Sequence, residues 1–405
     1  MAHRATHDPR NSDLVSTSSA VMKNVCIITH KLKKGDGQGR VNYEILMAAR
    51  AVGYVITLLA SECAQEVASL EGVTWVSIPV QGWPTQLLRN QVFALRSWWW
   101  LKRTSQVFDL VHANGFITWY PAEINSAHFV HGAWQDSPYN ETRTEKGLKK
   151  AYHQIFTWIN AVLERRSYQQ ARWVTAVSPK IAEELIGIGV DPEKIIIIPN
   201  GVDVQEYCPG TAVRELSAFR KMDNVALFAG DLRSSRKNLD TVLRALNIAR
   251  SWHLIVLGYL EQSPYPDMVR DMDLADRVHF MGYREDVAAF LHSADLLVFP
   301  SRYDPWAMIV SESLACAVPV ITAKTVGASF QVPANGGWIL DDPDDYQSIA
   351  NFMQDFSQMS LSKRKEMATA ARDSAINLSW DFISKKYVDL YDCMSSHASE
   401  DCRSF

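Results

Sequence analysis

Several features that mark large classes of protein are missing from this sequence. None of its apolar runs approaches the roughly 18 residues that a membrane-spanning helix needs. Its 41 basic and 45 acidic residues nearly balance, so the formal net charge of -4 provides no field that would attract a polyanion. The sequence therefore predicts neither a membrane-spanning protein nor one that binds nucleic acid.

Metal-binding and disulfide motifs are missing as well. The six cysteines occur without a C-x-x-C pair, and the eleven histidines form no H-E-x-x-H pattern. We therefore expect no metal, no cofactor, and reduced cysteines in a cytoplasmic protein. Residues 1–20 lack the apolar core of a secretory signal and are rich in small polar residues, which predicts a disordered leader.

The chain does contain a regular alternation of short apolar runs with longer stretches of helical period. Runs such as "KNVCIITH", "YVITLLA" and "DLVHAN" are separated by segments such as "VNYEILMAARAVG". After a pause near residues 200–210 the pattern resumes, with "NVALFAG", "DLLVFPS" and "VPVITA" as strand-like runs. This alternation is typical of an α/β protein with parallel sheets.

The pause divides the chain into two Rossmann-like domains, 21–203 and 204–376. The segment 377–396 has a helical period and follows the last helix of the second domain, so we expect it to cross back onto the first domain, ahead of a tail at 397–405. Ligands of such sheets bind beyond the carboxyl ends of the strands. Two facing domains would therefore share one deep cleft.

Four stretches resemble a known family when they are taken in order: 35–60, 174–209, 228–246 and 299–323. Together they resemble the retaining GT-B glycosyltransferases of family 4 (glycosyl transferases group 1), over about residues 22–395. The resemblance implies two facing Rossmann-like domains. It also implies a nucleotide diphosphate-sugar donor held mainly by the second domain and an acceptor held mainly by the first.

The stretch "SRYDPWAMIVSESLACAVPV" carries the acidic part of the resemblance. The family has an E-x7-E segment there, and Asp304 stands at the first acid while Glu312 keeps the second. By resemblance, Asp304 lies near the donor sugar and Glu312 accepts hydrogen bonds from the ribose. Both roles are chemically reasonable because ionised carboxylates accept strong hydrogen bonds from hydroxyl groups. The amides of Ala307, Met308 and Ile309 would begin a helix and bind the diphosphate. The alternative is an aspartate that caps the helix and a solvated glutamate.

The loop "GDLRSSRKN" carries three cations. Arg236 and Lys237 align with the basic pair of the family, and cations placed there would stabilise the departing diphosphate. The family often has an arginine where this chain has Asp231. Arg233 would replace that arginine, and we expect the Asp231 carboxylate to point elsewhere. A solvated basic turn is the alternative.

The glycines and histidines of the first domain extend the predicted site. Gly37 and Gly39 follow the first strand and would let the backbone approach the donor phosphates, although a plain tight turn is also compatible with them. By resemblance, a histidine at the end of a first-domain strand lies beside the transferred sugar. His131, followed by Gly132, fits this role better than His128, and a buried core histidine is the alternative.

Two further segments are candidates for binding. By resemblance, the backbone after Gly282 meets the nucleotide base, with Tyr283 or Arg284 alongside. The helix predicted at 87–106 combines three consecutive tryptophans, 98–100, with basic residues. That composition suits peripheral contact with the inner membrane face, and ordinary packing of the three indoles is the alternative.

The sequence thus predicts a retaining, metal-independent glycosyltransferase. Its acceptor would be a glycan or a lipid-linked molecule in cell-surface polysaccharide or glycolipid synthesis. Two alternatives remain open: a non-catalytic sugar-nucleotide-binding protein that keeps the GT-B scaffold, and a GT-B nucleotide-sugar epimerase.

Overall fold

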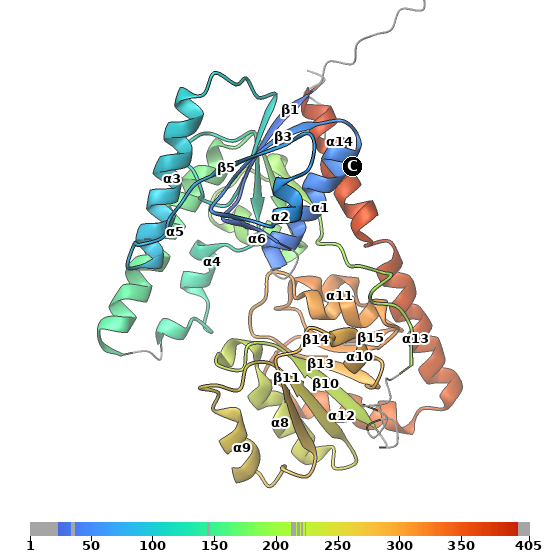
Figure 1. Cartoon of the computed structure of the whole chain (residues 1–405). Helices are drawn as coiled ribbons and strands as arrows, with labels where there is room; N and C mark the ends of the chain where they lie inside the picture. Colours follow the sequence, from blue (N-terminus) through green and yellow to red (C-terminus); the bar gives the residue numbers. More distant parts are fainter. Residues whose placement is uncertain are drawn as a thin grey trace, which may run out of the picture.

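Two parallel β-sheets form the framework of the molecule (Figure 1). The computed structural model describes residues 23–33, 37–143, 146–211 and 224–395, with three single residues between 211 and 224. The expected leader (1–20) and tail (397–405) lie outside the described residues. A mixed α/β chain with one parallel sheet in each half confirms the predicted fold class.

The first sheet has seven parallel strands in the order β5-β3-β1-β6-β7-β8-β9. Its strands are β1 (Asn24–Ile28), β3 (Val55–Ala60), β5 (Val73–Ser77), β6 (Leu110–Asn114), β7 (Ile124–Ala127), β8 (Trp173–Ala176) and β9 (Ile195–Ile197). Two-residue strands β2 (Lys31–Leu32) and β4 (Glu62–Cys63) pair beside it. The helices of this half are α1 (Gly37–Ala51), α2 (Gln65–Ala68), α3 (Gln86–Arg103), α4 (His131–Asp136), α5 (Gly147–Gln170) and α6 (Pro179–Gly187).

The second sheet has six parallel strands in the order β12-β11-β10-β13-β14-β15. They are β10 (Val225–Ala229), β11 (His253–Leu257), β12 (Val278–Gly282), β13 (Leu296–Phe299), β14 (Val320–Ala323) and β15 (Gly337–Leu340). Its helices are α8 (Leu239–Ile248), α9 (Tyr265–Asp271), α10 (Val287–Leu291), α11 (Met308–Ala315), α12 (Tyr346–Gln358) and α13 (Leu361–Ile376). Strands β10 and β13 are apolar along their whole length because helices cover both faces of the sheet.

The last helix, α14 (Trp380–Ser395), packs on the first half of the chain beside α1 (Figure 1). Its Tyr387 and Tyr391 are fully buried, and the Tyr391 hydroxyl is 2.6 Å from Nδ1 of His112 on β6. Because both groups are buried, this hydrogen bond joins α14 to the centre of the first sheet. The domain boundaries predicted from the sequence, 21–203, 204–376 and 377–396, stay predictions.

Two local features differ from the sequence-based expectations. Cys393 on α14 is disulfide-bonded, so the expectation of reduced cysteines is wrong at this position, whereas Cys26, Cys63, Cys208 and Cys316 are free. The sequence also predicts a helix from about 306 to 317, but the observed α11 is shorter, because Ala307 and Ala317 both adopt positive φ angles at its ends. No helix in the described part of the chain combines the length and the apolar character that a bilayer crossing requires.

Candidate functional site

The candidate site lies at the carboxyl edge of the second sheet, where the order of the strands reverses. From β10 the chain moves outward through β11 and β12, and it returns to the other side of β10 with β13. Loops that follow β10 and β13 therefore diverge at this point and leave a crevice, which is the usual ligand position in such sheets. The predicted cationic loop follows β10, and the predicted acidic segment follows β13.

Lys237 and Asp304 meet across this crevice. The Lys237 ammonium is 2.5 Å from Oδ2 of Asp304, and both side chains are largely buried. Burial alone would raise the pKa of Asp304, but the positive charges of Lys237 and Arg236 outweigh it and hold the pKa below its ordinary value. Asp304 is thus an ionised acceptor at neutral pH.

Backbone and side-chain bonds fix the loop that carries these cations. The Arg236 guanidinium donates to the carbonyl of Tyr303 at 3.0 Å, and the carbonyl of Arg236 accepts from the amide of Arg302 at 2.9 Å. Arg302 in turn pairs with Asp240 and with Asp344, each at 2.7 Å. The cationic loop is therefore preorganised and does not behave as a solvated basic turn.

The turn that precedes α11 is strained. Ala307 has φ 72° and ψ 87° and is buried, in a conformation that residues other than glycine rarely adopt. Met308 and Ile309 follow it in the first turn of α11, where backbone amides lack partners within the helix. The predicted anion-binding residues are therefore placed where a diphosphate could be bound.

A cavity of about 320 Å³ lies beside this turn, also at the carboxyl edge of the second sheet. Of the predicted donor-binding residues, five line it: Arg233, Tyr283, Arg284, Ile309 and Glu312. The predicted residues that do not line it are Gly37, Gly39, His131, Arg236, Lys237, Gly282, Asp304, Ala307 and Met308.

Two charged side chains of this cavity are already paired. The Arg233 guanidinium makes two 2.9 Å bonds to the two carboxylate oxygens of Asp231, and Arg284 pairs in the same way with Asp286. Asp231 also lines the cavity, and its carboxylate is neutralised by Arg233. That this carboxylate points away from a bound phosphate stays a prediction.

Sequence inspection missed Tyr259, the aromatic partner of Tyr283 in this cavity. The two rings stack in parallel, with centroids 4.6 Å apart and planes 6° apart, and both side chains are about half exposed. Such a pair presents a flat apolar face that suits a planar ring. The only sequence signal was the position of Tyr259 just after β11.

Glu312 lies at the α11 side of the cavity. Its burial, together with the negative charge of Glu206 from the connecting segment, raises the pKa of Glu312 to about 7. A hydrogen bond with Tyr207 and the charge of Arg40 act in the opposite direction. The carboxyl therefore changes its protonation state near neutral pH.

On the first domain, His131 begins α4 and is held by a residue that the sequence did not single out. Its Nδ1 lies 2.7 Å from Oε1 of Glu164 on α5, and its amide donates to the other carboxylate oxygen at 2.9 Å. Glu164 is buried, and this pairing orients the imidazole with Nε2 pointing away from the carboxylate. His131 is therefore not an isolated core histidine.

The other first-domain candidates are less well placed. Burial lowers the pKa of His128 to about 4, and its Nε2 atom has no partner among the described residues. Gly37 and Gly39 lie in the first turn of α1, so the loop between strand and helix is shorter than expected. Residues 34–36 of that loop lie outside the described part of the chain.

Tyr303, next to Asp304, joins the two domains. Its hydroxyl donates to Glu184 on α6 at 2.9 Å, and its ring packs against Phe129 and Trp134 with centroids 5.4 and 4.9 Å away. Ser178 at the start of α6 also donates to the carbonyl of Pro305 at 3.0 Å. These contacts bring the His131 end of α4 close to the Asp304 segment.

Two family models match the chain in succession. Residues 35–206 match the Glycosyltransferase Family 4 model, and residues 211–374 match the Glycosyl transferases group 1 model. The chain belongs to the family 4 glycosyltransferases. Its two sheets with the facing loops give this glycosyltransferase the GT-B fold, as its structural neighbours also show.

Individual relatives are distant. The lipopolysaccharide glucosyltransferase WaaG of Escherichia coli K12 is 23% identical over 250 residues, which are 58% of this chain and 63% of WaaG. The crystal structure of WaaG, a glycosyltransferase involved in lipopolysaccharide biosynthesis, superposes with a TM-score of 0.70 at 17% identity, over 91% of this chain and 99% of that one. Anabaena HepE in complex with UDP-glucose gives a TM-score of 0.66 at 17% identity, over 91% and 99%.

Proposed function

We propose that this glycosyltransferase transfers a sugar, with retention of anomeric configuration, from a nucleotide diphosphate-sugar to a glycan or lipid-linked acceptor in cell-surface polysaccharide or glycolipid synthesis. The observation that carries the proposal is the Lys237–Asp304 pair in the crevice where the strand order reverses. It lies beside a cavity that ends at Glu312. HepE, which has the same fold, binds UDP-glucose, and this supports the choice of donor class.

The chemistry follows from the charges in the crevice. As the bond between the sugar and the diphosphate breaks, the leaving oxygen gains negative charge, which Lys237, Arg236 and the first-turn amides of α11 stabilise. The acceptor hydroxyl attacks from the same face, and its proton passes to the leaving phosphate. His131, oriented by Glu164, donates or accepts a hydrogen bond at a sugar hydroxyl. Metal independence is part of this proposal, and the described residues include no group of three or more acidic, histidine or cysteine side chains that could hold a metal ion.

The first experiment is a thermal-shift measurement with UDP, GDP and ADP, because a ligand that binds the native state raises its midpoint. A shift with one of them, lost in Glu312→Ala, supports the donor site. Proton NMR of the product then reports the anomeric configuration, and an inverted product would contradict the proposal.

The paired Asp231 and Arg233 favour one second candidate, a non-catalytic sugar-nucleotide-binding protein. In this arrangement Asp231 partly neutralises the charge of Arg233 when no phosphate is bound. Such a protein would show the nucleotide shift but release no free UDP from UDP-glucose with any acceptor. Steady release of UDP that requires an acceptor excludes this candidate.

Peripheral membrane contact through α3 belongs to the main proposal. Trp99 and Leu95 are more than half exposed, and the Arg103 guanidinium lies 4.0 Å from the Trp99 ring centroid, while Trp100 packs near Phe108. An indole and a cation therefore lie together on the surface, a combination that is typical of helices bound in the lipid headgroup region. Co-sedimentation with vesicles containing phosphatidylglycerol should fall in Trp99→Ala/Arg103→Gln but stay unchanged in Lys324→Gln, a control in the second domain. Equal sedimentation of all three proteins would contradict the contact.

A further inference from the structure

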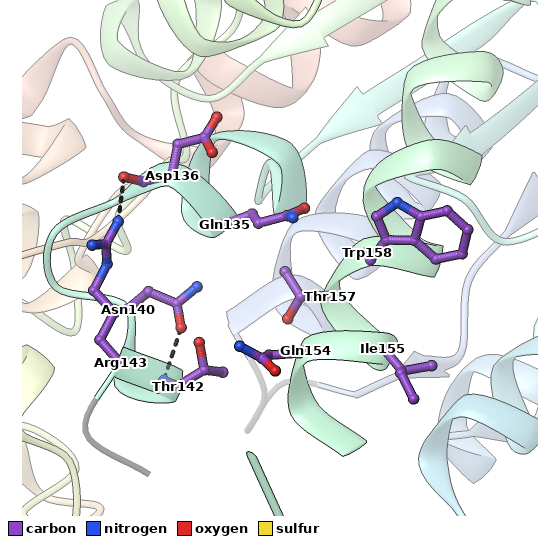
Figure 2. Close-up of a pocket in the computed structure, with 9 residues that line it drawn as sticks. All are labelled: Gln135, Asp136, Asn140, Thr142, Arg143, Gln154, Ile155, Thr157 and Trp158. Carbon is purple, nitrogen blue, oxygen red and sulfur yellow. Dashed lines mark hydrogen bonds between the residues drawn. The ribbon is translucent and has the colours of Figure 1, made fainter. Parts of the chain in front are cut away.

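A second, larger cavity lies on the first domain, with a volume of about 490 Å³ (Figure 2). It is formed between α4, the 3-10 turn η1 (Glu141–Arg143) and the N-terminal half of α5. No predicted site residue lines it. A volume of this size is within the range of small-molecule binding sites.

The cavity is built by the same two helices that hold the His131–Glu164 pair. Gln135 follows His131 by four residues on α4, which is about 6 Å along a helix, and Thr157 precedes Glu164 by seven residues on α5, about 10 Å. A ligand in the cavity would therefore extend to within about one sugar unit of the His131 imidazole.

The same part of the first domain faces the second. The ring of Trp134 on α4 packs against Tyr303, which is the neighbour of Asp304. Burial raises the pKa of Tyr139, and the negative charges of Asp344 and Asp342 in the second domain raise it further. The segment between α4 and η1, which forms one wall of the cavity, is therefore at the domain junction.

The frame of the cavity is preorganised. Asn140 is buried, donates to the carbonyl of Trp134 at 2.9 Å and accepts from the amide of Thr142 at 2.9 Å. The Arg143 guanidinium donates to the backbone carbonyls of Ser137 and Asp136 at 3.0 and 3.3 Å. Figure 2 shows the two bonds between labelled residues as dashed lines. These bonds fix the turn that forms one wall.

The lining is neutral and rich in amides. Gln135 and Gln154 come from facing helices, and their side-chain amides make no hydrogen bond within the described residues, so both can bind a ligand. Asp136 and Arg143 are the two charged residues of the lining, and their charges cancel. Trp158, 58% exposed, adds an apolar ring at the edge. A phosphate or carboxylate ligand would require an excess of cations, which this lining does not have.

We propose that this cavity binds a neutral pyranose unit of the acceptor, next to the unit that receives the sugar; the inference rests on the proposed function. The glutamine amides each present a donor and an acceptor to neighbouring hydroxyls, and the indole of Trp158 covers the apolar face of the ring. The acceptor is then a glycan rather than a phosphorylated small molecule, and the cavity determines which glycan is accepted.

The test uses the full chain with saturation-transfer NMR in the presence of UDP. The probes are maltose, cellobiose, lactose and, as a charged comparison, glucose 6-phosphate. We expect saturation of at least one neutral disaccharide, with affinity about tenfold weaker in Gln135→Ala/Gln154→Ala, since each of the two lost hydrogen bonds to a sugar weakens binding by roughly threefold. Trp158→Ala should weaken it similarly, and Trp158→Phe should restore part of the loss. Leu148→Ala, an exposed position on the same helix outside the cavity, should have no effect.

Two outcomes would overturn the inference: no neutral disaccharide binds the wild type, whether or not glucose 6-phosphate does, or the cavity variants bind as tightly as Leu148→Ala. The UDP thermal shift is measured on every variant and should stay at its wild-type value, which also verifies folding. If the wild type shows no shift with UDP, GDP or ADP, the proposed donor site fails. Saturation-transfer NMR still measures disaccharide binding and its loss in the variants. A failure of the proposed donor site can therefore be distinguished from a failure of the proposed sugar-binding cavity.

Discussion

The ammonium group of Lys237 lies 2.5 Å from the carboxylate of Asp304, and the two residues come from loops that follow the neighbouring strands β10 and β13. The contact joins a predicted phosphate-binding cation to a predicted sugar-binding acid. In the absence of donor each neutralises the other, which permits both charges to be buried. A bound diphosphate would compete with Asp304 for the same ammonium.

Replacing Lys237 by alanine should lower kcat by about 10²–10³-fold, because a preorganised cation is removed from the leaving group. It should also lower the free energy of unfolding by about 1–3 kcal/mol, because the buried Asp304 loses a charged partner. Initial-rate kinetics and urea unfolding measure the two effects.

A double variant separates the two effects. Lys237→Ala/Asp304→Ala leaves no unpaired charge, so much of the stability should return while the rate stays low. Lys324→Ala, which breaks an exposed pair with Asp341, should change neither quantity appreciably. A Lys237→Ala enzyme with nearly wild-type turnover would remove Lys237 from the catalytic role.

The pKa of Glu312 gives donor binding a pH dependence. The pKa is raised from 4.5 to about 7, and the ionised carboxylate is the better acceptor for ribose hydroxyls. Donor affinity should therefore fall as the pH drops from 8 to 6. Glu312→Gln should weaken donor binding at pH 8 and flatten this dependence, which isothermal titration with UDP measures at each pH.

The raised pKa of Glu312 has the opposite effect on stability: donor affinity should rise with pH, whereas the unfolding free energy should fall. The unfolded carboxyl ionises near 4.5 and the folded one near 7, so the folded state binds more protons between these values and the unfolding free energy falls as the pH rises through that window. Glu312→Gln should therefore stabilise the free enzyme at pH 8, by roughly 1–3 kcal/mol. A variant that binds UDP normally and melts at the wild-type temperature would contradict both expectations.

The sequence predicted the parts of the site that depend on strand ends. Parallel strands bring their carboxyl ends to one edge, so the loops with Lys237 and Asp304 begin side by side because their strands β10 and β13 are neighbours. The family models and the GT-B neighbours confirm the family and the fold. The roles of the individual site residues stay predictions.

Other parts depend on packing between elements that are distant in sequence. Glu164 lies 33 residues after His131 in the middle of a long helix, and only the docking of α4 on α5 shows that the two meet. The stacking of Tyr259 on Tyr283 likewise depends on the pairing of β11 with β12. The shorter α11 depends on the φ angle of Ala307, which its residue type does not indicate.

Ala307→Gly should stabilise the enzyme. Ala307 has φ 72°, a conformation in which a Cβ atom destabilises the folded state by about 1–2 kcal/mol. Glycine removes this strain, but the greater conformational freedom of the unfolded glycine chain cancels about half of the gain. We expect a net gain of roughly 0.5–1 kcal/mol in urea unfolding. Ala315→Gly, at the helical end of α11, should instead lower stability by about 1 kcal/mol. A loss of stability in Ala307→Gly would show that the alanine methyl group contributes packing that outweighs the strain.

Acid should weaken the attachment of α14 through the buried His112. Burial, and to a smaller extent the charge of His128, lowers the pKa of His112 from 6.5 to about 3, while its ring bonds Tyr391 and Ser126 at 2.6 and 2.7 Å. Between pH 3 and 6.5 the unfolded state binds more protons than the folded one, so the unfolding free energy should fall as the pH drops through this window. Above pH 6.5 the contribution of the buried, neutral His112 to stability should be complete.

Tyr391→Phe tests the bond itself and His112→Gln tests the titration. Removing the Tyr391 hydroxyl leaves a buried ring nitrogen without a partner and should cost about 1–3 kcal/mol at pH 7.5. His112→Gln removes the ionisable group, so its unfolding free energy, measured by urea at pH 5.0 and 7.5, should change less between the two values than that of the wild type. The other buried histidine nearby, His128, still titrates in both proteins, and the difference between them therefore reports His112 alone. An identical pH slope in wild type and His112→Gln would show that another group controls the acid sensitivity of the first domain.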